Sequence, residues 1–163
     1  IMKNVLQKII FCLALSFTFG CSSDDNTTEK NELIFEFDKE QFEKNREAWL
    51  SNDFQNYNYF EYQMSSSTGP LEYQIEVRGG IAKNVSEPDV KSKSISQIYE
   101  EIQKNVDFYT SPDYKSEGKE HYSLYVRYDS EFHYPTYYSL TLYNAPPGGG
   151  GFSKEFSEFE LIE

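Results

Sequence analysis

The sequence predicts an α+β domain in which two helices pack on one face of a single curved antiparallel sheet of about six strands, in the order αβββαβββ. Two segments carry apolar residues at helical spacing, and six others alternate apolar with polar residues or are rich in aromatic residues. Short turns join most of these six segments, and strands joined by short turns pair antiparallel. A sheet with one polar face buries the other under helices, which places both helices on one side.

The first predicted helix spans residues 38–52. Asp38 is placed to cap its start, with Gln41 three residues later in a capping-box arrangement. Phe42 and Trp49 lie seven residues apart and therefore share one helix face. This spacing favours a core position for Trp49 over a role in stacking on a ligand.

Three strands are predicted next, over residues 57–64, 71–78 and 81–85. The first is aromatic on both parities, which is typical of a strand covered on both faces. The second is apolar at every other residue, which indicates a strand with one buried face. Gly79 and Gly80 both accept a positive φ and predict a tight hairpin turn between the second strand and the third.

The second predicted helix runs from Ile95 to Val106. Ser94 is its capping residue, and Gln97 follows three residues later as in a capping box. Isoleucines and a valine at helical spacing form its apolar stripe. The acidic pair Glu100 and Glu101 is predicted to lie on the outer, solvated face of this helix rather than to act as a catalytic pair.

Three further strands are predicted over residues 122–128, 138–142 and 156–161. The first two alternate apolar with more polar residues, as strands with one buried face do. In the last, the apolar parity slips between Phe156 and Phe159. A slip of one residue within a strand predicts a β-bulge at that point.

The first 20 residues predict a signal peptide, because a basic start precedes an apolar run that is too short to span a membrane as a helix. Residues 18–21, Thr-Phe-Gly-Cys, resemble the lipobox of bacterial lipoproteins, in which the cysteine becomes the lipidated first residue. We therefore expect Cys21 to carry acyl chains that attach the protein to a membrane. The alternative is a soluble secreted protein with a spare cysteine.

The chain is accordingly divided into three parts. Residues 1–20 are the expected signal peptide, residues 21–34 the lipidated cysteine with an acidic tether, and residues 35–163 one α+β domain. The tether is polar and without periodic apolar positions. The expected location is the cell envelope, with a lipid anchor in the outer membrane; the periplasmic side and the exposed surface are both left open.

The composition is acidic and poor in cysteine. A formal net charge of -12 argues against a nucleic-acid partner, which would require clustered Lys and Arg. Cys12 would be lost with the signal peptide and Cys21 would carry the anchor, so we expect neither a disulfide nor a thiolate metal site. No cofactor is predicted.

Several segments between residues 40 and 143 form a recognisable set. They are Trp49, residues 57–62 (Tyr-Asn-Tyr-Phe-Glu-Tyr), 75–81 (Ile-Glu-Val-Arg-Gly-Gly-Ile), 94–102 (Ser-Ile-Ser-Gln-Ile-Tyr-Glu-Glu-Ile) and 126–135 (Val-Arg-Tyr-Asp-Ser-Glu-Phe-His-Tyr-Pro). Together these segments resemble a known family of bacterial envelope proteins, domain of unknown function 6174. Members often carry cysteines where residues 65–67 are serines, and glycine where His133 stands. The resemblance implies an envelope domain without an assigned activity.

The predicted turn at residues 129–135 is the most metal-like pattern in the chain. Asp129, Glu131 and His133 alternate beside Tyr134, and carboxylates with imidazole bind divalent cations. Alternating residues in a tight turn need not converge, so a solvated turn is favoured and no metal site is predicted. The sequence has no G-x-S-x-G nucleophile motif, and we expect no catalytic residues; a hydrolase is the distant alternative.

Three tyrosines, Tyr125, Tyr137 and Tyr143, fall on the polar parity of their strands. An aromatic row on an open sheet binds glycans, peptides or proteins, or else pairs across strands and only stabilises the sheet. The first hypothesis is a non-catalytic binding module that uses these tyrosines and the turn at residues 129–135. The second is an assembly accessory that docks on another envelope protein through its sheet edge.

Overall fold

The computed structural model describes residues 32–145 and 149–163 of the chain. The predicted signal peptide, Cys21 and the tether up to residue 31 lie outside these residues. In the described part, no helix is both long enough and apolar enough to cross a membrane. Residues 32–34, which were predicted to belong to the tether, are instead the start of a strand.

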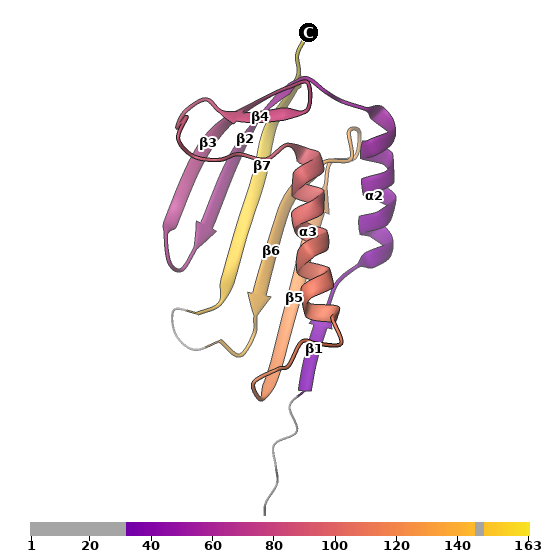
Figure 1. Cartoon of the computed structure of the whole chain (residues 1–163), viewed down its shortest axis with the longest axis vertical. Helices are drawn as coiled ribbons and strands as arrows, with labels where there is room; N and C mark the ends of the chain where they lie inside the picture. Colours follow the sequence, from indigo (N-terminus) through magenta and orange to yellow (C-terminus); the bar gives the residue numbers. More distant parts are fainter. Residues whose placement is uncertain (1–31, 146–148) are drawn as a thin grey trace, which may run out of the picture.

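A seven-stranded sheet and two helices make up the described chain, which is therefore α+β as predicted (Figure 1). In chain order the elements are β1 (Glu32–Glu36), α2 (Lys39–Asn52), β2 (Tyr57–Ser65), β3 (Gly69–Arg78), β4 (Ile81–Asn84), α3 (Ile95–Thr110), β5 (Lys119–Tyr128), β6 (Pro135–Leu142) and β7 (Gly151–Leu161). Across the sheet the strands lie in the order β1-β5-β6-β7-β2-β3-β4.

The sequence predicted about six antiparallel strands, but the sheet has a seventh strand that is parallel to its neighbour. The seventh, β1, lies at the sheet edge and pairs parallel with β5, with Glu32 opposite Lys119 and Glu36 opposite Ser123. Its single inward ring, Phe35, stacks on Tyr109 of α3 at 5.3 Å between centroids. Phe35 and Leu33 are half-buried, and the other three residues of this short strand are exposed.

Both predicted capping residues are confirmed, but a complete capping box is formed only at α3. Asp38 caps α2, since its side chain accepts a hydrogen bond of 2.9 Å from the backbone N–H of Gln41. Ser94 and Gln97 form a complete capping box at α3, which satisfies two backbone donors that have no partner within the helix. α3 continues one turn beyond the predicted end, to Thr110, whose hydroxyl donates to the Val106 carbonyl at 2.7 Å.

The hairpin and the bulge that the sequence predicts are both present. Gly79 and Gly80 have φ values of 55° and 76° between β3 and β4. In β7, the pairing with β2 shifts between Asn58 and Phe60, and Glu158 has a φ of 53°. The extra residue turns Phe159 toward the helices as well as Phe152 and Phe156, although Phe159 is an odd-numbered residue and the other two are even-numbered.

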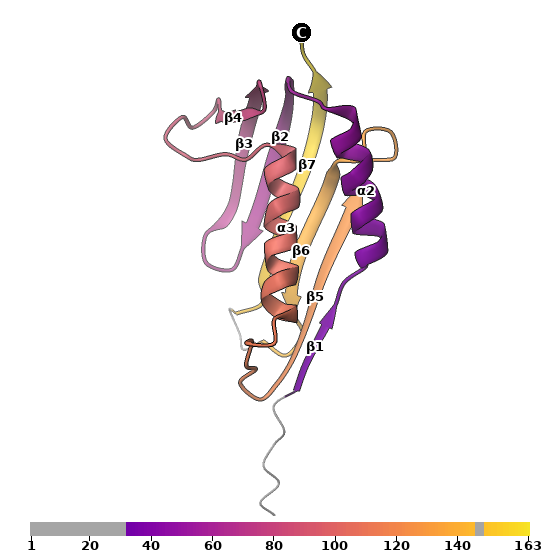
Figure 2. The ribbon, with the colours of Figure 1, turned by 45° about the vertical axis from the view of Figure 1, so that its right-hand side comes forward.

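The helices cover one face of the sheet and leave the other open, as the sequence predicts (Figure 2). α3 lies across the middle strands and α2 lies beside it, toward the β5 and β1 edge. Aromatic rings fill much of the layer between helices and sheet. Its largest fully buried side chains include Trp49, Tyr57, Tyr99, Tyr138, Phe42 and Phe156.

Candidate functional site

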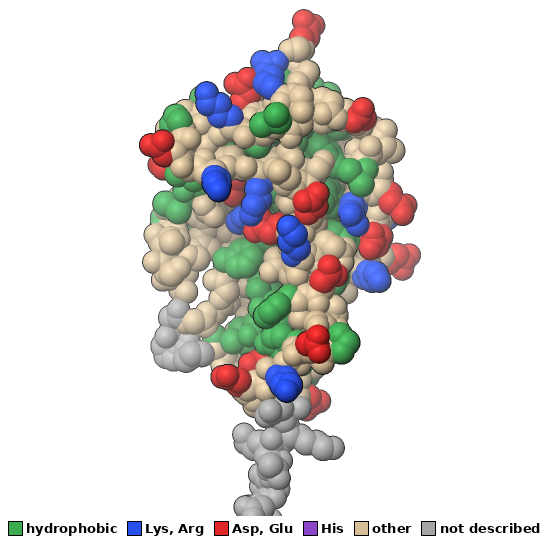
Figure 3. Space-filling view, in the orientation of Figure 1, with side chains coloured by type: hydrophobic (Ala, Val, Ile, Leu, Met, Phe, Trp, Pro, Cys, Tyr) green, Lys and Arg blue, Asp and Glu red, His purple; other side chains and the backbone are tan. Residues whose placement is uncertain are grey.

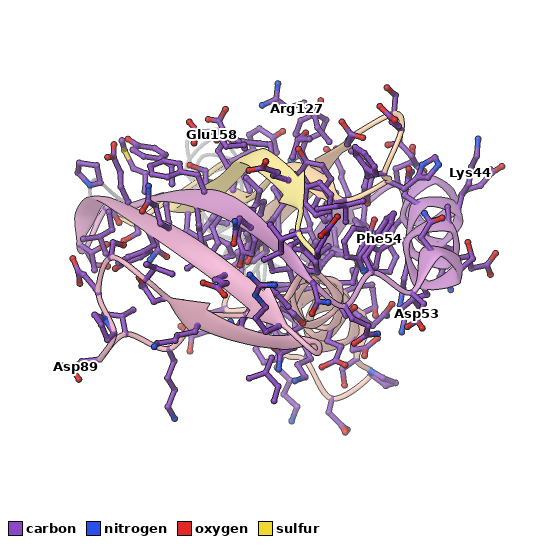
Figure 4. All side chains as sticks on the ribbon, turned by 90° about the horizontal axis from the view of Figure 1, so that it is seen from above. Lys44, Asp53, Phe54, Asp89, Arg127 and Glu158 are labelled. Carbon is purple, nitrogen blue, oxygen red and sulfur yellow. The ribbon has the colours of Figure 1, made fainter. Side chains whose placement is uncertain are left out.

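The open face of the sheet carries a row of polar and aromatic side chains. The strand register places Arg127, Tyr137, Glu155 and Tyr62 next to one another on four neighbouring strands, β5, β6, β7 and β2. Viewed along the sheet, Arg127 and Glu158 point away from the helices (Figure 4). The row therefore lies on the side that neither helix covers.

Two of the three predicted tyrosines lie together on this face. The rings of Tyr125 and Tyr137 are 6.2 Å apart between centroids, and the Arg127 guanidinium lies 4.7 Å from the centre of the Tyr137 ring. Tyr125 is 54% exposed. A guanidinium over an aromatic ring is attracted by the ring's electrons and holds the ring in place, so this pair presents a fixed aromatic surface.

Tyr143, the third predicted tyrosine, comes directly after β6 and is 60% exposed. Its ring lies 4.4 Å from the imidazole of His121, which in turn is 2.9 Å from a carboxylate oxygen of Glu36 on β1. Tyr143 thus belongs to a second small group, at the β1 edge. The structure places it apart from the pair formed by Tyr125 and Tyr137.

Small hydroxyl residues form a shallow pocket of about 270 Å³ beside Tyr137. Its floor comes from the paired strands β6 and β7, where Ser139 lies opposite Ser153. Met64 of β2 lines the pocket as well. Gly151 closes one end: a Cβ atom there would lie 1.7 Å from the Leu140 carbonyl oxygen, so only glycine lets β7 approach β6 this closely.

In the turn at residues 129–135, side chains form hydrogen bonds that stabilise the turn and attach it to α2. One carboxylate oxygen of Asp129 accepts hydrogen bonds from the backbone N–H groups of Glu131 (2.9 Å) and Phe132 (2.7 Å). The His133 Nδ1 lies 3.1 Å from the side-chain oxygen of Asn45 on α2. Among the described residues no group of three His, Cys, Asp or Glu side chains converges as metal ligands do.

Tyr134 does not contribute to a surface. Its side chain is buried, and its ring stacks on Phe159 with 4.8 Å between centroids. Its inclusion in the candidate binding surface was therefore wrong. The sequence pattern placed Tyr134 in a turn, where the alternation of a strand cannot be used to predict burial. The ring of Phe159, which the β7 bulge turns inward, covers Tyr134.

A network of charged side chains lies under α3, on the covered face. The Lys154 ammonium of β7 donates to both carboxylate oxygens of Glu101, at 3.1 and 3.4 Å. The Lys93 ammonium and the Tyr138 hydroxyl also donate to Glu101, each at 2.5 Å. The prediction that Glu101 lies on the solvated face of its helix was wrong, because three donors hold it against the sheet.

Glu61 of β2 completes this ion network. It is only 8% exposed and lies 3.7 Å from the Lys154 ammonium. Burial raises the pKa of Glu61 above its usual value, and Lys154 offsets this only in part. Burial also raises the pKa of Glu101, but the Lys154 charge and the bonds from Lys93 and Tyr138 outweigh burial and lower it overall.

The ion network is the part that sequence reasoning missed, although a signal exists. Glu61 has the same strand parity as the buried Tyr57 and Tyr59, and Lys154 the same parity as the buried Phe156. Opposite charges at positions that alternate with the buried residues of two strands indicate a buried ion pair. The two strands are far apart in sequence, so the pairing becomes visible only with the sheet order.

The fold and these surfaces define a small α+β domain with one open sheet face and a charged network beneath the helix on the other. The chain belongs to a family of unknown function, DUF6174, whose model matches residues 41–144. This confirms the resemblance to domain of unknown function 6174. His133 has a positive φ of 63°, a backbone that glycine adopts most easily, which is consistent with the glycine that the resemblance implies at this position. No curated protein and no solved structure matches the chain.

Proposed function

We propose that this protein is a non-catalytic, membrane-anchored binding module of the cell envelope, and that the open sheet face binds a protein partner with a basic surface. The observation that carries the proposal is the aromatic pair on the open face, in which Tyr125 is exposed, Tyr137 is half-buried and Arg127 lies over the Tyr137 ring. Tyrosine and arginine dominate the binding energy of protein interfaces.

The hydroxyl residues beside this pair support a protein partner. Surfaces that combine rigid tyrosines with small serines bind proteins well, because the rings supply contact area at low entropic cost and the hydroxyls supply adaptable hydrogen bonds. Ser139 and Ser153 occupy such positions next to Tyr137. The shallow form of this pocket suits a broad contact better than an enclosed small molecule.

Charge favours a basic partner. Glu155 of β7 lies opposite Tyr137, and Glu160 of β7 and Glu72 of β3 carry further negative charge on the same open face. Glu76 of β3 is paired with Arg78 at 2.7 Å. The whole chain has a formal net charge of -12. Complementary charge accelerates association and selects among partners.

A decisive experiment places a photo-crosslinking amino acid at position 125 and, as a control, at position 108. Phe108 is equally exposed, at 58%, but belongs to α3 on the other face. We expect one partner to crosslink from position 125 and not from 108. The purified partner is then expected to bind the Tyr125→Ala, Tyr137→Ala double variant about tenfold or more weakly, and Phe108→Ala unchanged.

Two results contradict the proposal. One is equal weakening by Phe108→Ala, which would move the contact to the helices. The other is competition by envelope polysaccharide with no protein crosslink, which would make the ligand a glycan. Added salt is expected to weaken the wild-type complex, since screening reduces the attraction between opposite charges.

The anchor is the second half of the proposal. The resemblance of residues 18–21 to a lipobox supports lipidation at Cys21 and an outer-membrane location. Wild type is expected to incorporate labelled palmitate, and Cys21→Ser to incorporate none. If wild type incorporates no label, the proposed lipid anchor is contradicted, while the proposal of partner binding is unaffected.

Assembly through a sheet edge is the second candidate function, and the edges favour it less than the open face. The two edge strands, β1 and β4, have five and four residues. Short edge strands are a common means of preventing sheet-to-sheet pairing. A partner that still binds after substitution of Tyr125 and Tyr137, and that protects β4 or β1 amides from hydrogen exchange, would favour the edge.

A further inference from the structure

A second pocket lies on the helix-covered side, next to the ion network. It has a volume of about 200 Å³ and is enclosed by β2, β3, β7, the start of α3 and the segment that leads into α3. Side chains of both charges gather on this side, over the upper part of α3 and beside it (Figure 3). Its lining includes Glu61, Lys91, Ser92, Lys93 and Lys154.

Glu61 is a buried group in this pocket that retains hydrogen-bonding capacity. A carboxylate offers about four lone-pair positions. The nearest ammonium, on Lys154, stands 3.7 Å away, beyond hydrogen-bonding distance, because Glu101 holds it at 3.1 Å. A buried carboxylate in this position is stabilised by a further donor, and the pocket is the space from which that donor can come.

The other charges around the pocket restrict what that donor can belong to. Three lysines, at positions 91, 93 and 154, face two carboxylates, Glu61 and Glu101, so the surroundings carry one excess positive charge. A simple cation would contact Glu61 but be repelled by the lysines. A simple anion would be attracted by the lysines but would meet the Glu61 carboxylate. A molecule with both charges satisfies both ends.

We propose that this pocket binds a small zwitterion of the amino-acid class, with its ammonium on Glu61 and its carboxylate toward Lys91 and Ser92. The remaining walls are Gln63, Tyr73, Val90 and Ile98, so the side chain of such a ligand meets one amide and three largely apolar side chains. The site lies on the opposite face from the aromatic pair. It therefore does not depend on the proposed function.

Three matched probes test the assignment on the wild-type protein: L-leucine, 3-methylbutylamine, which lacks the carboxylate, and 4-methylpentanoate, which lacks the ammonium. Binding is followed by amide chemical shifts. Leucine is expected to bind saturably and to shift residues that line the pocket. Each half-ligand is expected to bind about tenfold or more weakly, the size of a lost charged hydrogen bond.

Variants then assign the two ends. Glu61→Gln keeps the shape of the side chain and is expected to weaken leucine binding about tenfold, whereas Glu47→Gln, which alters an exposed carboxylate of α2, leaves it unchanged. Lys91→Ala alters an exposed loop residue, remains folded, and is expected to weaken leucine binding severalfold. It keeps the test decisive if Glu61→Gln perturbs the fold.

Three results overturn the proposal. They are an absence of saturable leucine binding at millimolar concentrations, binding of 4-methylpentanoate as tightly as leucine, and leucine binding that neither Glu61→Gln nor Lys91→Ala affects. The second of these would make the pocket an anion site formed by the lysines. None of them bears on partner binding at Tyr125 and Tyr137.

Discussion

The two faces of the sheet use the same residue type in opposite ways. On the covered face the tyrosine hydroxyls act as structural groups: that of Tyr138 donates to Glu101 at 2.5 Å, and that of Tyr57 accepts from the backbone N–H of Ile95 at 2.9 Å. On the open face, the rings of Tyr125 and Tyr137 lie 6.2 Å apart between centroids, with Tyr125 exposed and Tyr137 half-buried. Strand parity decides between these roles, because it decides whether the hydroxyl is removed from water.

The covered face is where a substitution should have its largest effect. Trp49 packs against Phe54, Tyr57 and Phe159, and its indole N–H donates to the Ser96 hydroxyl at 3.1 Å. Trp49→Ala is expected to lower the free energy of unfolding by about 3–5 kcal/mol in urea denaturation.

The neighbouring residue provides the control for Trp49. Leu50 lies on the same helix but is 52% exposed, and Leu50→Ala should change stability by less than about 0.5 kcal/mol. Similar losses for both variants would mean that the covered face is not the core of the domain.

The ion network should give an intermediate effect that depends on pH. The lowered pKa of Glu101 contributes stability that is present above its usual value of 4.5 and is lost as pH falls through the lowered pKa. The raised pKa of Glu61 acts in the opposite sense, since its contribution is present below 4.5 and is lost as pH rises through the raised pKa.

Urea midpoints of the Gln variants, measured from acidic to neutral pH, separate these contributions. As pH rises, the stability of Glu101→Gln should fall progressively relative to wild type. The stability of Glu61→Gln should rise progressively relative to wild type. Curves that run parallel to wild type for both variants would show that neither carboxylate has a different pKa in the folded state.

The open face should show the smallest effect on stability. Tyr125→Ala is expected to cost less than about 1 kcal/mol, the range of a cross-strand pair, and to leave the circular dichroism spectrum unchanged. Phe108→Ala, at similar exposure on α3, is the control. Unfolding of the Tyr125 variant would show that its ring is structural and would remove the proposed binding surface.

Local sequence signals predicted the parts of this fold that depend on near neighbours. The cap at Ser94, the turn at Gly79 and the bulge near Glu158 each rest on residues a few positions apart, and all three are confirmed. The strand β1 was missed because a five-residue parallel partner is recognised only once β5 is in place.

The candidate sites divide in the same way. Alternation along single strands placed Tyr125 and Tyr137 on one face, and the structure shows both rings there. The ion network needs Glu61, Glu101 and Lys154 from three elements, and no single segment indicates that they meet. Tyr134 was misplaced because its burial depends on a ring from another strand, Phe159.

The parallel pairing of β1 also has a mechanical consequence. The described chain enters through Glu32 at one end of the sheet and ends at Glu163 near the other, with β1 running along the long axis (Figure 1). A pull on the chain ahead of Glu32, with the domain held at its far end, is therefore directed along the strand. All five residue pairs between β1 and β5 then resist together in shear, instead of opening one after another as in a zipper.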